Sequence, residues 1–280
     1  MRELEVRAVT ENIKEMCIEA NHVLSYDMKK ALRDAADAED APLGKQVLKQ
    51  LLDNMEIAQK DMIPICQDTG MTVIFLEIGQ NVHFAGGDLS EAVQEGVRQG
   101  YEEGFLRKSV VKDPIFRDNT KDNTPAVIHY EIVPGDKVRI TVAPKGFGSE
   151  NMSRVFMLKP ADGIEGVKNV VLTAVKDAGP NACPPMVVGV GVGGTFEKCV
   201  LMAKKALLRP MDQRSEIPYI SELENELLDK INASGIGPGG LGGRITALAV
   251  NIETYPTHIA GLPVAVNICC HVNRHATRIL

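Results

Sequence analysis

The order of helix-like and strand-like segments is the feature that most restricts how this chain can fold. Residues 4–60 contain three helix-like stretches, in which apolar side chains such as Ile13, Cys17 and Leu24 recur at helical spacing. From about residue 70 onward, apolar strand-like runs alternate with amphipathic helices, beginning with the run 71–76. This order predicts an α/β fold with a mixed sheet, surrounding helices and a helical N-terminal segment.

The later elements follow from the same periodicities. Asp88 stands where a helix N-cap is expected, and Pro134-Gly-Asp136 separates two strand-like runs, which indicates a hairpin. No convincing linker or fixed-period repeat interrupts the chain, so we expect one domain over residues 1–280. The expected helices are 89–101, 166–177, 195–208 and 221–231, and the expected strands are 71–76, 126–133, 137–142, 186–190, 245–252 and 262–268.

Charge and hydrophobicity narrow the class of protein. The 280 residues are 44% hydrophobic and 24% charged, which is typical of a globular chain. A net charge of −6 gives no general attraction for phosphate backbones, so we expect no nucleic-acid partner. No apolar run approaches the ~20 residues that span a bilayer. The charged N-terminus lacks the apolar region of a signal peptide, so a cytoplasmic location with no membrane contact is expected.

The cysteines are the residues most able to carry chemistry. Cys66, Cys183 and Cys270 stand in expected loops beside strands, whereas the other three lie in apolar helix or strand patterns. Taken alone, the loop cysteines could be small buried hydrophobes or ligands, and no C-x-x-C pair points to a zinc ribbon. Three thiolates on a cubane cluster would leave one iron open as a Lewis acid, which favours catalysis over electron transfer.

Four motifs carry a resemblance that covers almost the whole chain. The sequence resembles the α subunit of class I iron–sulfur fumarate hydratases and the related L-tartrate dehydratases. This resemblance implies a hydro-lyase that reversibly hydrates fumarate to L-malate with a [4Fe-4S] cluster. The motifs are Cys66-Gln-Asp-Thr-Gly70, Lys145-Gly-Phe-Gly-Ser-Glu-Asn151, Ala182-Cys-Pro-Pro185 and the ending Cys270-x-x-x-Arg274.

The resemblance also implies roles for single residues. Asp68 matches a substrate-contacting position near the proton transfer and is the expected catalytic residue of this chain. Arg107 matches an arginine that binds a substrate carboxylate, for which its planar guanidinium is suited. The implied cluster ligands are Cys66, Cys183 and Cys270, and the implied substrate-binding residues are Gln67, Asp68, Arg107, Gly146, Ser149, Asn151 and His258.

The same resemblance implies a partner. In this family a catalytic base and further carboxylate-binding residues come from a β subunit, so we expect a hetero-oligomer that acts on a C4 dicarboxylate. L-tartrate dehydratase is the nearest alternative, because it runs the same chemistry on a substrate with one more hydroxyl. The stretch 146–152 and the ending 267–275 resemble the fumarate hydratases more closely, but Phe147 departs from the usual run of three glycines.

Two more distant alternatives rest on other residues. A zinc protein could use Cys270, His271 and His275, provided that the histidines lie on a helix. A nucleotide-binding module could use the glycines of 189–194, although their spacing differs from the dinucleotide fingerprint. Those glycines are better explained by close backbone packing near Cys183.

Overall fold

The computed structural model describes all of residues 1–280 and divides into two compact units. The first unit contains residues 1–25, 55–147 and 274–280, and the second contains residues 26–54 and 148–273. Both units are discontinuous in sequence, and α3 and α5 each contain residues of both. The prediction of a single domain therefore stays a prediction.

The first unit is built on a four-stranded mixed sheet in the order β10-β5-β2-β4. β2 runs antiparallel to β5 and parallel to β4, and β10 lies antiparallel to the other edge of β5. The nearly continuous apolar sequence of β2 explains its central place, since its side chains are buried along most of its length. The strands are β2 (Met71–Gly79), β4 (Val127–Val133), β5 (Val138–Lys145) and β10 (Ala276–Ile279).

The hairpin predicted around residues 134–136 is wrong, although both of its strands exist. β4 and β5 do not pair with each other, because β2 lies between them. The turn instead wraps around the end of β2: the Asn81 backbone N–H donates to the Gly135 carbonyl at 3.0 Å. The more apolar strand takes the centre of the sheet, where its burial stabilises the fold most.

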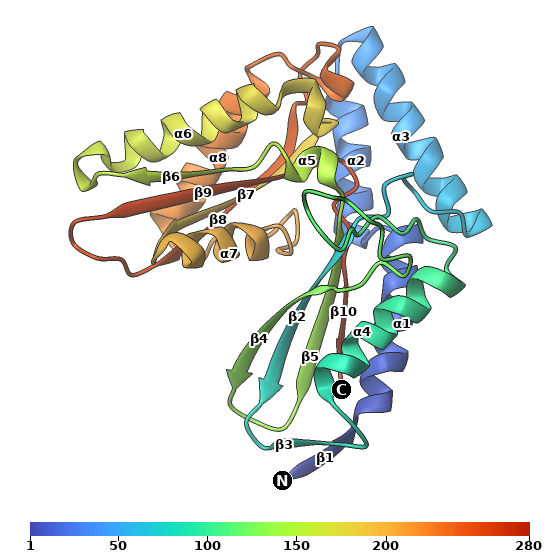
Figure 1. Cartoon of the computed structure of the whole chain (residues 1–280). Coiled ribbons are helices and arrows are strands. Elements are labelled where there is room, and N and C mark those ends of the chain that lie inside the picture. Colours follow the sequence, from blue (N-terminus) through green and yellow to red (C-terminus); the bar gives the residue numbers. More distant parts are fainter. The chain divides into compact units, whose positions relative to one another are not determined.

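Two helices cover one face of this sheet (Figure 1). α1 (Val6–His22) and α4 (Leu89–Glu103) approach closely because α4 has glycines at the contact. A Cβ on Gly100 would lie 2.7 Å from the Cys17 Cβ. Asp88 caps α4 as predicted, accepting from the Glu91 N–H at 2.9 Å. The short strands β1 (Arg2–Glu5) and β3 (Val82–Ala85) pair beside this core and were not predicted.

The second unit has its own four-stranded sheet in the order β6-β9-β7-β8. β7 is parallel to β8 and antiparallel to β9, and β9 is antiparallel to β6. As a result the start of β7 and the end of β9 meet at one end of the sheet. The strands are β6 (Arg154–Leu158), β7 (Met186–Gly193), β8 (Ala247–Tyr255) and β9 (Leu262–Cys269).

Helices cover both faces of the second sheet, with α7 on one side and α6 and α8 on the other (Figure 1). α7 sits close to β7 because β7 is rich in glycine, and a Cβ on Gly191 would lie 2.0 Å from the Cys199 carbonyl oxygen. Gly189 and Gly191 of the run 189–194 therefore allow the close packing of α7 on β7. The helices are α6 (Gly163–Ala178), α7 (Phe196–Ala206), α8 (Pro218–Asn232) and, earlier in the chain, α2 (Tyr26–Ala38), α3 (Pro42–Asp61) and α5 (Phe147–Glu150).

The glycine-rich segment 235–243 holds a buried carboxylate. Glu39, 1% exposed at the end of α2, accepts from the backbone N–H groups of Arg244 and Ile245 at 2.9 Å, just after the segment. It also accepts from Ala41 at 3.0 Å. A Cβ on Gly243 would lie 2.9 Å from this carboxylate, so the glycine is required by the close approach.

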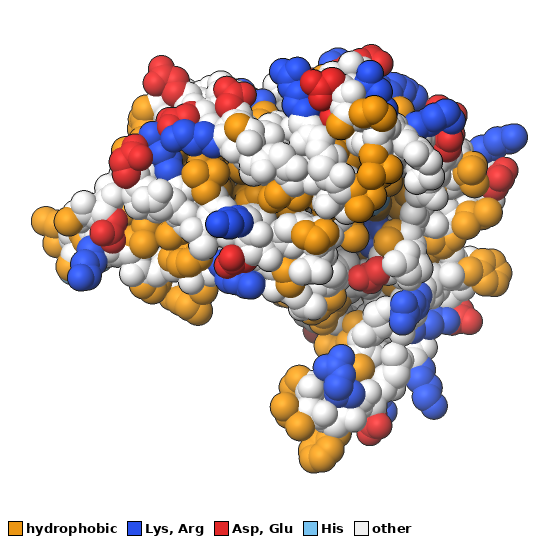
Figure 2. All heavy atoms as spheres, turned by 90° about the horizontal axis from the view of Figure 1, so that it is seen from above, with side chains coloured by type: hydrophobic (Ala, Val, Ile, Leu, Met, Phe, Trp, Pro, Cys, Tyr) orange, Lys and Arg blue, Asp and Glu red, His pale blue; other side chains and the backbone are white.

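The predicted fold class is confirmed. The three N-terminal helices, the mixed sheets and the surrounding helices all appear. None of the helices combines the length and the apolar character that crossing a membrane requires. On the face in Figure 2, acidic and basic side chains are intermingled with apolar ones.

Candidate functional site

The six cysteines fall into two groups by burial. Cys17, Cys199 and Cys269 are buried, whereas Cys66 and Cys270 are partly exposed and Cys183 is exposed. Burial raises the pKa of the Cys17 thiol to about 12. The Cys199 pKa is also raised by burial. The thiols that can meet a ligand are therefore the three that the sequence placed in loops.

In the first unit, the loop between α3 and β2 contains Cys66, Gln67 and Asp68. The Asp68 Oδ1 accepts from the Gly70 N–H at 3.0 Å, and its Oδ2 accepts from the Phe147 N–H at 2.8 Å. The Asp68 N–H points to the Cys66 Sγ at 3.4 Å. The carboxylate thus has a set orientation, and the loop supplies an N–H donor to the Cys66 sulfur. Gln67 is exposed beside it.

Three side chains, of which sequence reasoning named only Arg274, hold this loop through its backbone carbonyls. The Tyr101 hydroxyl donates to the Thr69 carbonyl at 2.7 Å, and the Asn123 side chain donates to the Gly70 carbonyl at 3.2 Å. The buried Arg274 donates to the Asp68 carbonyl at 2.5 Å. Arg274 was singled out as part of a motif, but its partner is more than two hundred residues away in sequence and leaves no local signal.

Arg107 lies on an adjoining stretch of the first unit. Its backbone carbonyl accepts from the Thr69 hydroxyl at 2.9 Å, so this stretch is tied to the Cys66–Gly70 loop. The side chain is exposed, and its guanidinium makes no salt bridge. Arg107 therefore offers an unneutralised charge to an anionic ligand.

In the second unit, Cys183 ends a short 3-10 turn in a conformation that most residues avoid. Its φ of 52° and ψ of 63° lie in the left-handed region, which is uncommon for a residue with a Cβ. The Gly239 N–H donates to the Pro184 carbonyl at 2.8 Å, so the glycine-rich segment supports this turn from outside. Such strain is kept where the surroundings enforce it, and it clusters at functional sites.

Cys270 follows the end of β9 and is linked to Cys183 through His271. The His271 Nδ1 lies 2.9 Å from the Cys183 carbonyl, and the Cys270 Sγ accepts from the Val272 N–H at 3.4 Å. Burial lowers the pKa of His271. The second unit therefore brings two of the three predicted ligands to one end of its sheet.

The loop predicted to surround the substrate contains α5, a single helical turn that was expected to be irregular. Gly146 lies against Asp68, since a Cβ on it would be 3.1 Å from the Asp68 Oδ2. Within the second unit, Ser149 is buried and Asn151 is exposed. The nearest neighbour that a Cβ on Gly148 would meet is the Asn181 carbonyl oxygen, two residues before Cys183.

His258 is not brought to the cysteines of its unit. It lies in the loop between β8 and β9, whereas Cys270 follows the far end of β9. β9 has eight residues, and a strand rises about 3.3 Å per residue, so roughly 26 Å separates its two ends. His258 instead lines a surface hollow with Lys198 and Tyr255.

No three His, Cys, Asp or Glu side chains gather closely enough in the structure to hold a metal ion. Residues 271–275 are not helical, so the helical histidine pair that the zinc alternative requires is not formed. The first unit contributes one accessible loop thiol and the second contributes two.

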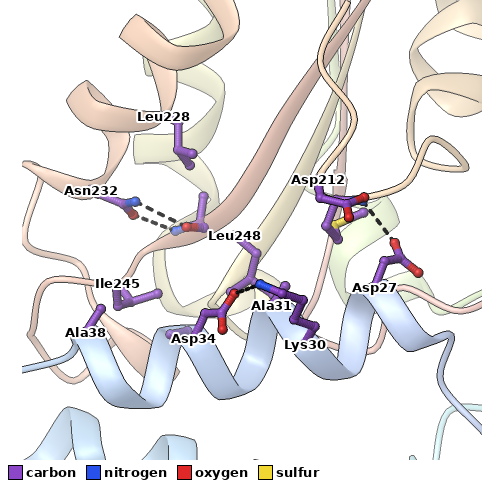
Figure 3. Close-up of a pocket in the computed structure, with 13 residues that line it drawn as sticks. Asp27, Lys30, Ala31, Asp34, Ala38, Asp212, Leu228, Asn232, Ile245 and Leu248 are labelled. Carbon is purple, nitrogen blue, oxygen red and sulfur yellow. Dashed lines mark hydrogen bonds and ion pairs between the residues drawn. The ribbon is translucent and has the colours of Figure 1, made fainter.

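A further cavity lies elsewhere in the second unit. It measures about 320 Å³ between α2, α8 and β8, with Lys30, Asp34 and Asn232 among its lining side chains (Figure 3). Several of its polar groups have partners: Lys30 pairs with Asp34 at 2.5 Å, and Asp27 accepts from the Met211 N–H at 2.9 Å. It contains no predicted site residue.

Comparison with known proteins shows the family to which the chain is similar. A family model described as fumarate hydratase (Fumerase) matches residues 10–279. A Methanocaldococcus jannaschii chain, provisionally named L(+)-tartrate dehydratase subunit alpha, is 43% identical over 276 residues, covering 96% of each chain. An Escherichia coli protein named L(+)-tartrate dehydratase subunit alpha is 34% identical over 256 residues, covering 90% of this chain and 84% of its own. A Shigella sonnei protein of the same name is 33% identical over the same length.

Proposed function

The chain belongs to the fumarate hydratase family, and from that premise we propose that it is the α subunit of an iron–sulfur hydro-lyase that converts fumarate and L-malate into each other. The observation that supports the proposal is that the cysteines fall into an accessible group and a buried group. The three at the family's motifs are the accessible ones, and the other three are buried. A cytoplasmic location stays part of the proposal.

Cys66, Cys183 and Cys270 fit the ligand set of a [4Fe-4S] cluster. Thiolates are the usual ligands of such clusters, and N–H donors to sulfur help to stabilise them. Cys66 and Cys270 each receive a backbone N–H at 3.4 Å. When bound, a cluster with three protein ligands supplies an open iron that acts as a Lewis acid toward the hydroxyl of the substrate.

The remaining roles belong to side chains of this chain. The exposed guanidinium of Arg107 binds a substrate carboxylate through its two parallel donors. Gln67, Ser149 and Asn151 supply hydrogen bonds to the dicarboxylate. The carboxylate of Asp68 keeps acceptor capacity beyond its two N–H bonds, so it can accept the proton that leaves the substrate carbon or pass it on.

A β subunit completes the enzyme. The relatives are named α subunits, which supports a partner for this chain. Near Arg107 the first unit also exposes large apolar side chains: Phe105, Ile115 and Phe116 are 91%, 79% and 84% exposed. Asp113 stiffens the turn that presents Ile115 and Phe116, because its Oδ1 accepts from both of their N–H groups, at 2.8 and 2.7 Å. An ordered apolar projection is typical of a protein-binding surface.

Dehydration of L-tartrate is the second candidate. It is favoured by the names of the relatives, one of which is 43% identical to this chain. The two substrates differ by one hydroxyl, so the same carboxylate-binding groups and the same Lewis-acid chemistry would serve both. Phe147 is half-exposed next to Asp68 and is the side chain of this loop best placed to respond to that difference.

His258 has a place in this proposal only under one condition. About 26 Å of strand separates it from Cys270. If it contacts the substrate, it does so from a second copy of the chain.

Anaerobic reconstitution with iron and sulfide tests the cluster. Absorbance and iron content are measured for the wild type beside Cys66→Ser, Cys183→Ser and Cys270→Ser, with Cys199→Ser as the control. About four irons per chain are expected, as in a [4Fe-4S] cluster. The three loop variants are expected to lose them and the control to keep them. Equal iron in all five proteins would contradict the ligand assignment.

Turnover by the co-expressed α–β pair tests the substrate. Rates are compared on fumarate, L-malate and L-tartrate at equal iron content. Higher kcat/KM on fumarate and L-malate supports the proposal, and higher kcat/KM on L-tartrate replaces it with the second candidate. No activity on any of the three would overturn both.

A further inference from the structure

A compact polar cluster in the second unit joins α5 to the strand that leads to Cys270. The Lys204 Nζ donates to the Glu150 Oε1 at 2.6 Å and to the Asn267 Oδ1 at 3.2 Å. The Asn267 Nδ2 donates to the Glu150 Oε2 at 2.9 Å. The three side chains therefore close a triangle in which both carboxylate oxygens have a donor.

This triangle is shielded from water. The side chains of Lys204 and Glu150 are 18% and 26% exposed, and Asn267 is 6% exposed. The polar groups line a hollow of about 170 Å³ whose other walls include Val155 and Val200. In such surroundings a charge pair with satisfied hydrogen bonds strongly restricts the orientation of its two side chains. Leaving either charge unpaired there would cost free energy.

The triangle is tied to the backbone on both sides. The Asn267 Nδ2 also donates to the Ser153 Oγ at 2.7 Å, and that oxygen accepts from the Ile268 N–H at 3.1 Å. Glu150 stands between Ser149 and Asn151, and Asn267 stands three residues before Cys270. The cluster therefore fixes the segment 149–153 against the end of β9.

We propose that Lys204 is a positioning residue, which holds Glu150 and, through it, Ser149 and Asn151 in a set place relative to Cys270. The inference rests on the proposed function, because the substrate-binding role of Ser149 and Asn151 gives the positioning its consequence. Without the ammonium, Glu150 lacks its counter-charge in a shielded place. The carboxylate then turns to water and the segment 149–153 loses its single conformation.

The test uses the reconstituted α–β enzyme with three replacements of Lys204. Lys204→Met keeps the apolar stem, Lys204→Gln keeps a donor without the charge, and Lys204→Arg keeps both. Lys198→Met is the control on the same helix, since its ammonium lies over the Tyr255 ring at 4.7 Å, away from the cluster. Hydrogen exchange of the 149–153 amides, KM, kcat and iron content are measured for each.

We expect Lys204→Met to speed exchange of the 149–153 amides at least tenfold and to raise KM at least fivefold, with iron content unchanged. Lys204→Gln should be intermediate, and Lys204→Arg and Lys198→Met should stay within twofold of the wild type. If Lys204→Met does not fold, the difference between Gln and Arg still decides. Equal exchange and equal KM in Gln and Arg would overturn the inference, because packing alone would then explain the residue.

The exchange measurement separates this inference from the proposed function. If the wild type shows no turnover on any dicarboxylate, the proposed function fails. The exchange rates then still report whether Lys204 fixes the segment. If the wild type is active and the variants match it in both exchange and KM, the positioning role fails alone.

Discussion

Each cysteine of this chain has a reactivity set by its immediate surroundings. Cys17 lies on α1 and packs against α4, and burial raises the pKa of its thiol to about 12. Cys183, by contrast, is exposed at the end of a turn in a left-handed conformation. A thiolate is the reactive and ligating form, so burial alone removes half of the cysteines from consideration as ligands.

Alkylation checks this difference directly. Iodoacetamide at pH 8 is expected to modify Cys66, Cys183 and Cys270 in the folded chain without iron. The three buried thiols should react only after denaturation, because their burial denies the reagent access to the sulfur. Mass spectrometry of the digested chain locates the adducts. Modification of Cys17 as fast as Cys183 would show that the burial is wrong.

At the scale of elements, the packing of the second unit depends on close approaches between backbone segments. Glycines on β7 let α7 come near enough for its carbonyls to occupy the space of a missing Cβ. The Glu39 carboxylate in turn fills the concave backbone next to the glycine-rich segment. Both contacts depend on glycine at particular positions and not on the hydrophobic pattern of the sequence.

Gly191→Ala tests the contact between helix and strand. A Cβ there would lie 2.0 Å from the Cys199 carbonyl oxygen, so α7 has to move away from β7. We expect a loss of about 1–3 kcal/mol in the free energy of unfolding. Gly261→Ala is the matched control, since the nearest atom lies at 4.0 Å. Equal stability of the two variants in urea titrations would refute this packing.

Glu39→Gln tests the buried carboxylate. Burial by itself would raise the pKa of Glu39, but the N–H donors of Arg244, Ala41, Ile245 and Asp40 outweigh it and lower the pKa. A lowered folded pKa means that the stabilisation is present above the unfolded value of about 4.3 and is lost as pH falls below it. The amide would turn a donor toward backbone N–H groups, which costs about 2 kcal/mol.

Urea titrations of Glu39→Gln at pH 7 and pH 3 provide the measurement. The difference from the wild type should be largest at pH 7 and should shrink at pH 3, because the unfolded carboxylate takes up its proton below about 4.3 and the advantage of the folded one is lost as pH falls. A difference that grows toward low pH would contradict the assigned direction of the pKa shift.

At the scale of the whole molecule, the open question is what covers the apolar projection of the first unit. Ile115 and Phe116 are held outward by the turn at Asp113 and contribute nothing to the core. Two large apolar side chains exposed in this way can stabilise the protein only when a partner covers them. The proposal of a β subunit accounts for that arrangement.

Phe116→Asp tests this surface. We expect the variant to fold with the stability of the wild type, because Phe116 is 84% exposed. Its affinity for the β subunit should fall at least tenfold, since a carboxylate would be buried at the interface. Co-purification and titration of the two subunits measure the change. The exposed Tyr26→Asp is the control, and an unchanged affinity for Phe116→Asp would place the interface elsewhere.

Periodicity was sufficient for most of the regular structure. The long helices and the apolar strands were predicted because each has a repeating pattern within its own residues. β1, β3, β6, β10 and α5 were missed, since they are short and their pairing partners lie far away in sequence. The false hairpin at 134–136 has the same origin, because a local turn signal cannot show that a third strand inserts between its arms.

In the candidate site, too, local motifs name some residues, and others are found only through contacts between distant parts of the chain. The candidate site residues were named from the family resemblance. The ligand role of the three cysteines and the roles of Gln67, Asp68, Arg107, Gly146, Ser149, Asn151 and His258 all stay predictions. Tyr101, Asn123 and Lys204 carry no motif, and only the structure shows that they hold the loops in place. It also separates His258 from Cys270 by the length of β9.

By itself, the sequence determined the fold class and the family, and it singled out the cysteines proposed as ligands, because these depend on local pattern and on residue identity. Only the tertiary structure decided which strands pair, which backbone groups hold the Asp68 and Glu150 carboxylates, and which predicted residues lie together. Those outcomes depend on contacts between residues distant in the chain. Such contacts form only when burial of the two cores brings them together.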